Sequence, residues 1–316
     1  MRYFVTGGAG FIGSNYVAHL FDEVEGVTGV TIYDKFTYAA NPRNYQEFTN
    51  DSRLTVIKGY ICDLSSLQNS MSNHDYVIHF AAESHVDRSI EDASIFVKTN
   101  VLGTLNVLEA SRKTGIRTVI HVSTDEVYGS LTTGSADETY NLKPNSPYAA
   151  SKAASDLLAR SYYVTHGLDV RTTRCCNNYG KNQFPEKVIP VFINKLKSGQ
   201  KIPIYGDGQN VREWIHVSDH NRGVQMVLEK GRPGEVYNIG TGSHLSNNDL
   251  AREIIKIMGL DQSLKSYIAD RPGHDFRYSV NSDKIASLGF KTLVSLENGI
   301  KETIDWYTHN LNWWKS

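Results

Sequence analysis

Cysteine is scarce in this chain: among 316 residues it occurs only as Cys62, Cys175 and Cys176. An odd number of cysteines, two of them adjacent, excludes a disulfide-rich secreted scaffold. The Cys175-Cys176 pair has no neighbouring Cys or His at metal-ligand spacing, so we expect buried free thiols and no metal site. Free thiols are typical of a reducing compartment.

Long apolar runs and blocks of like charge are also missing. The longest apolar segments, such as 77–82, are far shorter than the roughly 20 residues that a membrane-spanning helix needs. The 33 basic and 34 acidic residues give a formal net charge of -1 and form no block, which argues against bulk nucleic-acid binding. Met1 leads directly into an expected strand instead of a secretion signal. The sequence therefore predicts a cytoplasmic protein that binds neither membrane nor nucleic acid.

The chain alternates short apolar β-rich runs with helical patterns up to about residue 175. Nearly continuous hydrophobicity is typical of parallel strands that are covered on both faces. Intervening helices, such as the one expected over 93–113, suit right-handed crossovers. We therefore predict an α/β fold with a Rossmann-like, doubly wound parallel sheet. The expected strands are 3–6, 27–33, 54–58, 76–80, 118–122 and 169–173.

Beyond residue 180 the regular alternation fades and turn signals become frequent. A helix is still clear over 246–258, where Ser246 is a suitable N-cap and Gly259 a suitable C-terminal signal. We expect a dinucleotide-binding domain over 1–175, to which later segments return. A smaller mixed α/β domain over 176–316 would mainly bind substrate.

A glycine-rich turn follows the first expected strand, with Gly7, Gly10 and Gly13 at three-residue spacing before an amphipathic helix. This context lets backbone amides and the helix N-terminus approach a pyrophosphate. Asp34 ends the second expected strand about 20 residues later, where a carboxylate would bind the ribose 2'-hydroxyl and repel a 2'-phosphate. The pattern indicates NAD in preference to NADP, although the adjacent Lys35 weakens that preference. A glycine turn without a ligand is the alternative, and the coincidence of the two signals disfavours it.

Asp63 and Leu64 follow the third expected strand, which ends near Gly59. Two interpretations stay open for them. Either they contact the adenine ring, or Asp63 caps the next helix.

Tyr148 and Lys152 have the i, i+4 spacing that places side chains on one face of a helix. A nearby cation favours the phenolate and lowers the pKa of a tyrosine from its usual ~10, as a base for a hydroxyl proton requires. This spacing is frequent by chance. It gains weight here because it follows the fifth strand of a Rossmann-like unit, at the start of a helix preceded by Pro147.

Thr124, Asp125 and Glu126 directly follow the fifth expected strand. The carboxyl ends of parallel strands border the ligand crevice, so these side chains should face the nicotinamide. Two adjacent carboxyl groups form an acid and base pair if their surroundings separate their pKa values. The alternative is a turn in which Asp125 caps the backbone and Glu126 is solvated.

Together these motifs are similar to those of extended short-chain dehydrogenase/reductases, and the chain closely resembles the dTDP-glucose 4,6-dehydratases of that superfamily. The run Thr124-Asp125-Glu126 is the most discriminating match, since related epimerases usually carry a small or hydroxyl residue at the position of Asp125. Tyr60 and Cys176 depart from the family pattern, which often has Asp at the first position and Ser at the second. Gln183, just before Phe184, is a feature that resembles the plant UDP-glucose dehydratases. The resemblance covers the segments 6–13, 81–89, 123–129, 145–152, 177–180, 184–187, 212–214, 219–220 and 271–275.

The resemblance implies an NAD-dependent hydro-lyase that oxidises C4 of a hexose, eliminates water from C5 and C6, and returns the hydride to C6. Tyr148 would take the O4 proton, with Lys152 tuning the phenol and Thr124 bound to O4. Glu126 would remove the C5 proton, and a protonated Asp125 would protonate the departing C6 hydroxyl.

The resemblance also implies binding residues and a partner. The substrate would be a nucleotide sugar, dTDP-glucose first, and the chain would form a homodimer through helices at 93–113 and 148–165. Cofactor contacts are implied for Gly7, Gly10, Phe11, Ile12, Gly13, Asp34, Lys35, Thr37, Asp63, Leu64, Phe80, Ala81, Ala82, Ser84, Thr99, Tyr148, Lys152 and Asn178. Substrate contacts are implied for Ser84, Thr124, Asn177, Lys187, Val188, Pro203, Tyr205, Arg212, Asn247, Arg271 and His274.

Three other functions stay open on the sequence alone. They are a dehydratase for a UDP-hexose, a nucleotide-sugar 4-epimerase or decarboxylase on the same scaffold, and a non-catalytic NAD-binding regulator. An epimerase or decarboxylase has no use for Asp125, and a binding protein has no use for the acid and base pair at Asp125 and Glu126.

Overall fold

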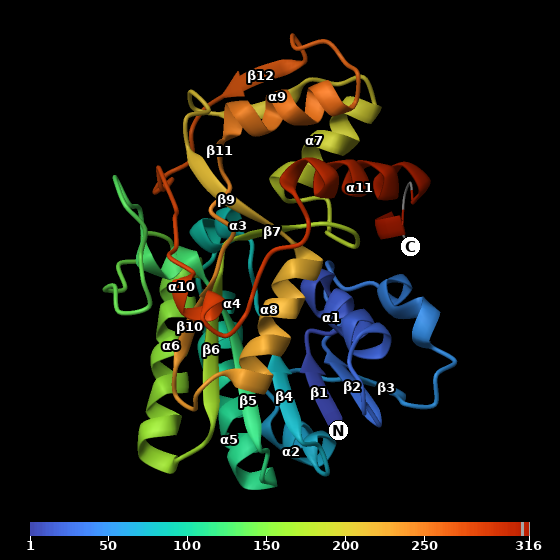
Figure 1. Ribbon diagram of the computed structural model, residues 1–316, viewed down its shortest axis with the longest axis vertical. Helices are drawn as coiled ribbons and strands as arrows, with labels where there is room; N and C mark the ends of the chain where they lie inside the picture. The colour runs from blue at the N-terminus through green and yellow to red at the C-terminus, as the bar shows by residue number, and fades with distance from the viewer. Residues whose placement is uncertain (311–312, 316) are drawn as a thin grey trace.

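A seven-stranded, wholly parallel sheet forms the lower half of the molecule in the computed structural model, which describes residues 1–310 and 313–315 (Figure 1). Its strand order is β10-β6-β5-β4-β1-β2-β3, with the reversal beside β1 that is typical of doubly wound folds. The predicted Rossmann-like fold is confirmed. The strands are β1 Arg2–Thr6, β2 Gly29–Asp34, β3 Leu54–Lys58, β4 Tyr76–His79, β5 Thr118–Thr124, β6 Val170–Cys175 and β10 Val236–Ile239.

The first six of these strands were expected from the sequence, and the seventh was not. Strand β10 comes from the later part of the chain and pairs with β6, from Val236 beside Thr172 to Ile239 beside Cys175. Residues beyond 176 therefore contribute both to the sheet and to the smaller unit above it.

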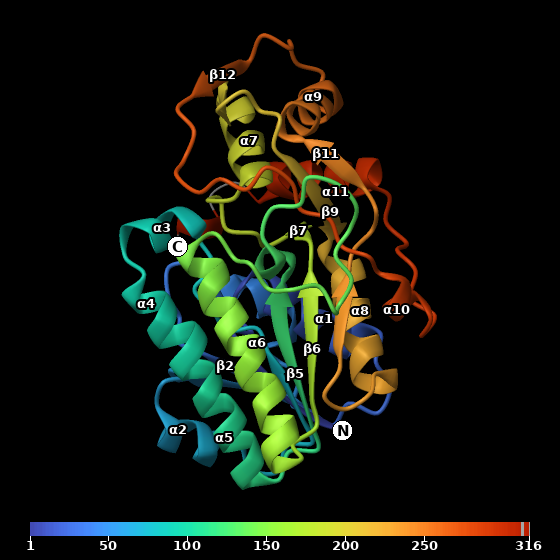
Figure 2. The same ribbon diagram turned by 90° about the vertical axis from the view of Figure 1, so that its left-hand side faces the viewer.

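Helices cover both faces of the sheet (Figures 1 and 2). On one face lie α1 Phe11–Asp22 and α8 Val217–Lys230, whose apolar side chains pack against β1, β2, β5 and β6. On the other face lie α2 Leu64–Met71, α5 Thr104–Thr114 and α6 Pro147–His166. Burial on both faces explains why β1, β2, β4 and β5 are largely apolar, whereas the edge strand β3 is partly exposed.

The helix expected over 93–113 is interrupted. It consists of α4 Ser94–Phe96, a π-helical segment η2 Val97–Gly103 and α5, and π-helical turns are frequent at functional sites. The wider turn places Asn100 against the loop after β4, where its side chain donates to the Glu83 carbonyl (2.9 Å) and accepts from the Glu83 amide (2.8 Å). The tertiary contact with Glu83 decides the local geometry here.

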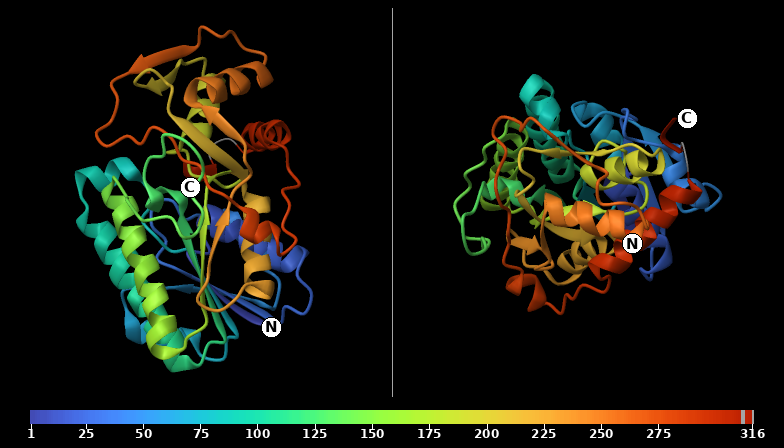
Figure 3. Two further views of the ribbon diagram at one scale, coloured as in Figure 1. Left: turned by 60° about the vertical axis from the view of Figure 1, so that its left-hand side comes forward. Right: turned by 90° about the horizontal axis from the view of Figure 1, so that it is seen from above.

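The smaller unit contains two short sheets and three helices (Figures 1 and 3). Its strands are β7 Asn177–Tyr179, β8 Ile202–Tyr205, β9 Val211–His216, β11 His244–Ser246 and β12 Lys265–Ile268. Its helices are α7 Val188–Lys197, α9 Asn247–Ile257 and α11 Leu296–His309, packed around Phe192, Trp214, Ile254 and Tyr307. The side chain of Ser246 accepts from the Asp249 amide (3.0 Å), as expected for an N-cap.

Short helical turns complete the chain. They are η1 Pro42–Phe48, α3 Val86–Glu91, η3 Asp125–Tyr128, α10 Asp283–Ala286 and η4 Trp313–Lys315. Among the described residues, none of the helices has the length and apolar composition that crossing a bilayer requires.

Candidate active site

A cavity of about 350 Å³ lies at the carboxyl ends of the sheet strands, between the sheet and the smaller unit. Its volume falls within the range of small-molecule sites. The sheet side contributes residues such as Gly10, Asp34 and Tyr148, and the smaller unit contributes Asn177 and Lys187. The ends of β1, β2, β4, β5 and β6 therefore meet at one site, as parallel topology requires.

Two positions of the glycine turn at this cavity, Gly7 and Gly13, tolerate no larger side chain. Gly7 has φ +71, and a Cβ there would lie 2.7 Å from the Ala81 backbone nitrogen. A Cβ on Gly13 would lie 2.3 Å from the Gly7 carbonyl oxygen. Helix α1 begins here with Gly10 as N-cap, and within the described chain no side chain caps it and no acidic residue lies in its first turn. The open amides and the positive end of the helix dipole fit a pyrophosphate.

Asp34 lies at the end of β2 and lines the cavity. Its two oxygens accept the backbone amides of Ala9 (3.0 Å) and Phe36 (2.8 Å). Burial raises the pKa of Asp34, and these two hydrogen bonds oppose that rise. The carboxyl group is thus fixed in orientation beside the glycine turn, which suits a ribose hydroxyl. Nearby, the Lys35 ammonium lies 4.0 Å from the centre of the Tyr60 ring.

Sixteen of the eighteen residues expected to contact the cofactor line this cavity, and Asp63 and Leu64 do not. Asp63 accepts the Ser66 amide (3.0 Å) and is the N-cap of α2, which corresponds to the second of its two interpretations. Gly59, Tyr60 and Ile61 line the cavity in that region. Their position directly after β3 was the signal that could have identified them.

Asp125 and Glu126 stand side by side at the end of β5, and both line the cavity. Burial, followed by the charges of Glu126 and Glu213, raises the pKa of Asp125 well above its usual value. Burial also raises the pKa of Glu126, but Lys187, Arg212 and a further arginine, Arg271, oppose it. The surroundings therefore favour a proton on Asp125 more strongly than on Glu126. Acid and base catalysis by two neighbouring carboxyl groups needs such a difference between their pKa values.

Tyr148 and Lys152 lie one turn apart on α6, which begins at Pro147, with Ser146 as its N-cap. Pro147 is thus the first residue of the helix and does not precede it. The Lys152 ammonium donates to the Val122 carbonyl (2.7 Å). The expectation that the pKa of Tyr148 lies below its usual value is wrong for the protein alone, because burial and the charge of Glu126 raise that pKa well above its usual value.

The residues expected to bind the nucleotide divide into two groups. Ser84, Thr124, Asn177, Lys187 and Val188 line the cavity. The others lie outside it, around the smaller unit; they are Pro203, Tyr205, Arg212, Asn247, Arg271 and His274.

The two arginines of this outer group already have partners within the chain. Arg271 forms an ion pair with Asp87 on α3 (3.0 Å), and Tyr205 approaches the same carboxyl group (3.5 Å). Arg212 is buried and donates to the carbonyls of Asp275 (2.8 Å) and Phe276 (3.3 Å). The Arg212 guanidinium is therefore directed at backbone carbonyls of this segment.

Several buried polar atoms in the cavity wall have no hydrogen-bond partner among the described residues. Unsatisfied buried polar atoms are rare in proteins because each costs desolvation energy. A polar ligand in the cavity could supply partners for these atoms. They are Ser123 Oγ, Asp125 Oδ2, Asn177 Oδ1, Asn178 Oδ1, Gln183 Oε1, Glu186 Oε2 and Trp214 Nε1. Cys175 and Cys176, expected as buried free thiols, are free and buried, and they also line the cavity.

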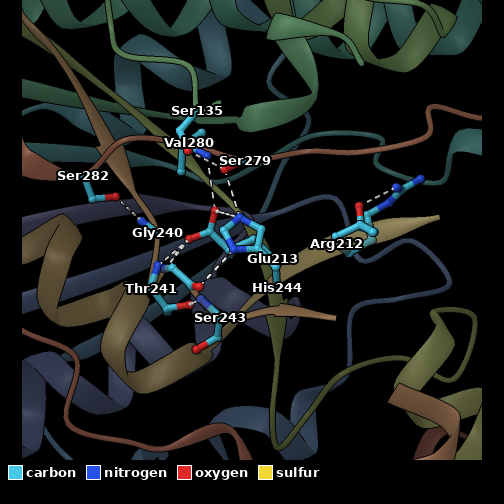
Figure 4. Close-up of polar contacts among 12 residues, drawn as sticks. Ser135, Arg212, Glu213, Gly240, Thr241, Ser243, His244, Ser279, Val280 and Ser282 are labelled. Carbon is cyan, nitrogen blue, oxygen red and sulfur yellow. Dashed lines mark hydrogen bonds and ion pairs between the residues drawn. The ribbon is translucent and has the colours of Figure 1, made fainter. Parts of the chain in front are cut away.

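Glu213, next to Arg212 on β9, holds the loop after β10 and the segment around Val280 in the smaller unit (Figure 4). The two side chains point in opposite directions, as successive strand residues do. The fully buried Glu213 carboxylate accepts the backbone amides of Thr241 (2.6 Å), Gly242 (2.8 Å) and Val280 (3.2 Å) and lies 3.5 Å from His244. Burial would raise its pKa, but these four donors outweigh burial and lower it.

Replacing Glu213 with Gln is expected to lower the free energy of unfolding by about 1–3 kcal/mol, because buried amides lose a charged acceptor. The lowered pKa of Glu213 stabilises the fold above about pH 4.3, and that contribution is lost as pH falls through the folded pKa. Glu213 also raises the pKa of His244, which stabilises the fold below about pH 6.5 and is lost as pH rises. The deficit should therefore be largest between about pH 4.3 and 6.5.

Urea unfolding followed by circular dichroism across this pH range measures the effect. Glu297→Gln is the matched control, since its ion pair with Lys301 is exposed and worth little. Equal unfolding midpoints for the Glu213→Gln variant and the unmodified protein at every pH would contradict the prediction.

A doubly wound sheet, a glycine turn, and a Tyr and Lys pair facing one cavity define the extended short-chain dehydrogenase/reductase class. The family model of GDP-mannose 4,6 dehydratase matches residues 4–303. Known relatives include the dTDP-glucose 4,6-dehydratase of an Actinoplanes species, 50% identical over 99% of this chain and 100% of that protein. The Escherichia coli dTDP-glucose 4,6-dehydratase is 40% identical over 100% of this chain and 96% of its own length. The chain belongs to the GDP-mannose 4,6 dehydratase family, and within it to the dTDP-glucose 4,6-dehydratase group.

Solved structures agree with this assignment. The DesIV dTDP-glucose 4,6-dehydratase from Streptomyces venezuelae, crystallised with NAD bound, is 50% identical and superposes with a TM-score of 0.98 over 100% of this chain and 99% of that one. The UDP-glucose 4-epimerase of Thermotoga maritima shares the fold at 31% identity, with a TM-score of 0.91 over 98% of this chain and 100% of that one.

Proposed function

We propose that the chain converts dTDP-glucose to the 4-keto-6-deoxy sugar by removing water. The observation that carries this function is the neighbouring pair at the end of β5, in which Asp125 favours its proton more strongly than Glu126 does, beside Tyr148. NAD is the cofactor; when bound, it would accept a hydride from the sugar C4 and return it to C6, while a proton returns to C5. The known relatives and the NAD-bound structural neighbours support this function.

The first stage makes the C5 hydrogen acidic by converting C4 to a ketone. Tyr148 takes the proton from the sugar O4, while Thr124, which forms a hydrogen bond with Tyr148, orients O4. Because burial raises the pKa of Tyr148, its phenolate forms only where positive charge is close. Lys152, held by the Val122 carbonyl one helical turn away, supplies that charge.

The second stage expels water. Glu126 takes the C5 proton, and the electron pair of that C–H bond forms the C5–C6 double bond as the C6–O bond breaks. Asp125 gives its proton to the departing C6 oxygen, which leaves as water. The assignment of acid and base follows from the neighbouring charges: those of Glu126 and Glu213 raise the pKa of Asp125, whereas Lys187 and two arginines lower that of Glu126.

We assign the cofactor mainly to the 1–175 domain and the nucleotide to the 176–316 domain. Lys187 fits a phosphate contact, because its ammonium reaches across the cavity to the Ser84 carbonyl (2.7 Å). The outer group of expected nucleotide contacts lies around β8 and the segment after β12. The rings of Tyr205 and His274 lie 6.2 Å apart there, and we assign them to the nucleotide base.

We also propose a homodimer through the helices on the α5 and α6 face. These helices lie side by side (Figure 2) and expose large apolar side chains. The exposed fractions of Val97, Leu102, Leu157 and Val164 are 54%, 44%, 60% and 63%. A second copy would bury such a patch. The three free thiols support a reducing, cytoplasmic location.

The decisive experiment supplies dTDP-glucose that carries deuterium on C4. We expect a 4-keto-6-deoxy product with the deuterium on C6, identified by mass spectrometry and NMR, and no net consumption of NAD. A product that carries no deuterium on C6 would contradict the proposed function.

A panel of dTDP- and UDP-hexoses separates the remaining functions. A 4-epimerase would return a sugar of unchanged mass, whereas a dehydratase product is lighter by one water. A binding protein without activity would leave every substrate intact while retaining NAD.

A further inference from the structure

Three segments that border the cavity meet at Tyr38, in the loop after β2. The Tyr38 hydroxyl donates to Glu186 Oε1 (3.1 Å) in the segment before α7. The Arg88 guanidinium on α3 lies 3.8 Å from the centre of the Tyr38 ring, and the Phe184 ring contacts that ring edge-on, with centroids 5.3 Å apart. We call Tyr38, Arg88, Phe184 and Glu186 the clasp. The mechanism described above gives none of them a role.

The Glu186 carboxyl group connects both sides of the clasp. Its Oε1 faces Tyr38, while its Oε2 lies 3.7 Å from Arg88 and 3.9 Å from His85. Burial and the charge of Glu186 raise the pKa of Tyr38, so the phenol stays neutral and keeps the proton that it donates. Tyr38 is 39% exposed, and a single contact at such a site is weak. Here three contacts share one side chain, so removing that side chain releases all three.

Residues 181–187 are tied to the sheet unit at both ends. At one end the Asn15 side chain on α1 donates to the Lys181 carbonyl (3.0 Å). At the other end the Lys187 ammonium donates to the Ser84 carbonyl (2.7 Å). The residues of this segment that line the cavity are Gln183, Phe184, Glu186 and Lys187. Because α1 begins at the glycine turn, the segment runs from the expected pyrophosphate site to the loops after β2 and β4.

Tyr38 and Arg88 lie behind the cavity wall. Their neighbours Thr37 and Ser84, both expected cofactor contacts, line the cavity, whereas neither Tyr38 nor Arg88 belongs to its described lining. The two side chains therefore act on the segments around the cofactor site and not on a ligand directly. The clasp joins the loop after β2, the segment after β4 and residues 181–187 where cofactor contacts are expected.

We propose that the clasp retains NAD through the reaction, with Tyr38 as the positioning residue that holds the three segments together. This role rests on the proposed function, in which one NAD molecule would take the hydride from C4 and return it to C6. Between those two events the cofactor is reduced and the sugar is a 4-ketone. A cofactor that escaped then would leave the sugar without its hydride. A reaction with no net consumption of NAD therefore needs a site that opens slowly.

The test measures cofactor exchange in the NAD-loaded enzyme without any sugar. The protein is mixed with an excess of isotopically labelled NAD and recovered by rapid gel filtration, and mass spectrometry gives the labelled fraction of bound cofactor. Tyr38→Phe removes only the hydrogen bond to Glu186, so exchange should be about threefold faster. Tyr38→Ala also removes the contacts with Arg88 and Phe184, so exchange should be about thirtyfold faster.

Two activity measurements separate retention from a general structural effect. Reduction of bound NAD on the first mixing with dTDP-glucose should match the unmodified enzyme in both variants, because Tyr38 does not line the cavity. During prolonged turnover in buffer without NAD, Tyr38→Ala should lose activity, and added NAD should restore it. Tyr267→Phe and Tyr267→Ala are the matched controls, since this exposed phenol donates to Asn248 Oδ1 (3.1 Å) outside the described cavity lining.

Equal exchange rates in Tyr38→Ala and the unmodified enzyme would overturn this role. An equal acceleration in Tyr267→Ala, or a loss of activity that added NAD does not restore, would do so as well, because either indicates a general loosening of the fold. The exchange rates do not depend on turnover, so this failure is distinct from that of the proposed function. The proposed function fails if unmodified enzyme gives no 4-keto-6-deoxy product from dTDP-glucose, whatever the exchange rates are.

Discussion

Replacing Asp125 with Asn is expected to leave the oxidation of C4 intact and to slow the loss of water by about 10²–10⁴-fold. The amide keeps the size of the side chain but has no acidic proton to give to the C6 oxygen. The variant should accumulate reduced cofactor with the sugar trapped before elimination. Stopped-flow absorbance in the near ultraviolet measures the first stage, and product analysis measures the second.

The control for this variant is Asp137→Asn, which makes the same chemical change on an exposed turn. Its two rates should equal those of the unmodified enzyme. Elimination by the Asp125→Asn variant at the unmodified rate would exclude Asp125 as the acid. A parallel loss of C4 oxidation would show that the substitution disturbs the Tyr148 site as well.

Replacing Tyr148 with Phe is expected to block the reaction at its first stage, with a fall in turnover of about 10³–10⁴-fold. The sugar O4 proton then has no acceptor, so C4 is not oxidised and reduced cofactor does not appear. Because the ring still fills its buried position, the folded structure and the affinity for the nucleotide sugar should change little. The absorbance signal that persists in Asp125→Asn is therefore absent here.

Tyr163→Phe is the matched control, since it removes a phenol from the same helix at a position 38% exposed to solvent. Rapid reduction of bound NAD by the Tyr148→Phe variant would show that another group takes the O4 proton. The two variants together assign each stage to its own residue.

The sheet was largely predictable because a short local sequence pattern indicates most of its strands. β1, β2, β4 and β5 are largely apolar runs bounded by turn residues, and they are covered on both faces of the sheet. β3 is a partly exposed edge strand, and β6 is mostly polar in sequence. β10 escaped prediction because its four residues follow a turn in a mixed part of the chain. Its place beside β6 depends on pairing with a strand more than sixty residues earlier. The π-helical segment in the helix expected over 93–113 also depends on a distant contact, that of Asn100 with Glu83.

The sequence by itself determined which catalytic and binding groups are available. The glycine turn, the Thr124 to Glu126 run and the Tyr148 and Lys152 pair each lie within a few residues of sequence, so a local pattern reveals them. Only the tertiary structure decided the protonation preferences. Burial and charges from β9 and from the segments after β12 make Asp125 favour a proton more strongly than Glu126. The sequence predicted a lowered pKa for Tyr148, but burial in the folded protein raises it. Tyr278 comes into contact with Glu126 across 152 residues. Such effects arise from the dielectric and the neighbours of a folded site, which no local pattern encodes.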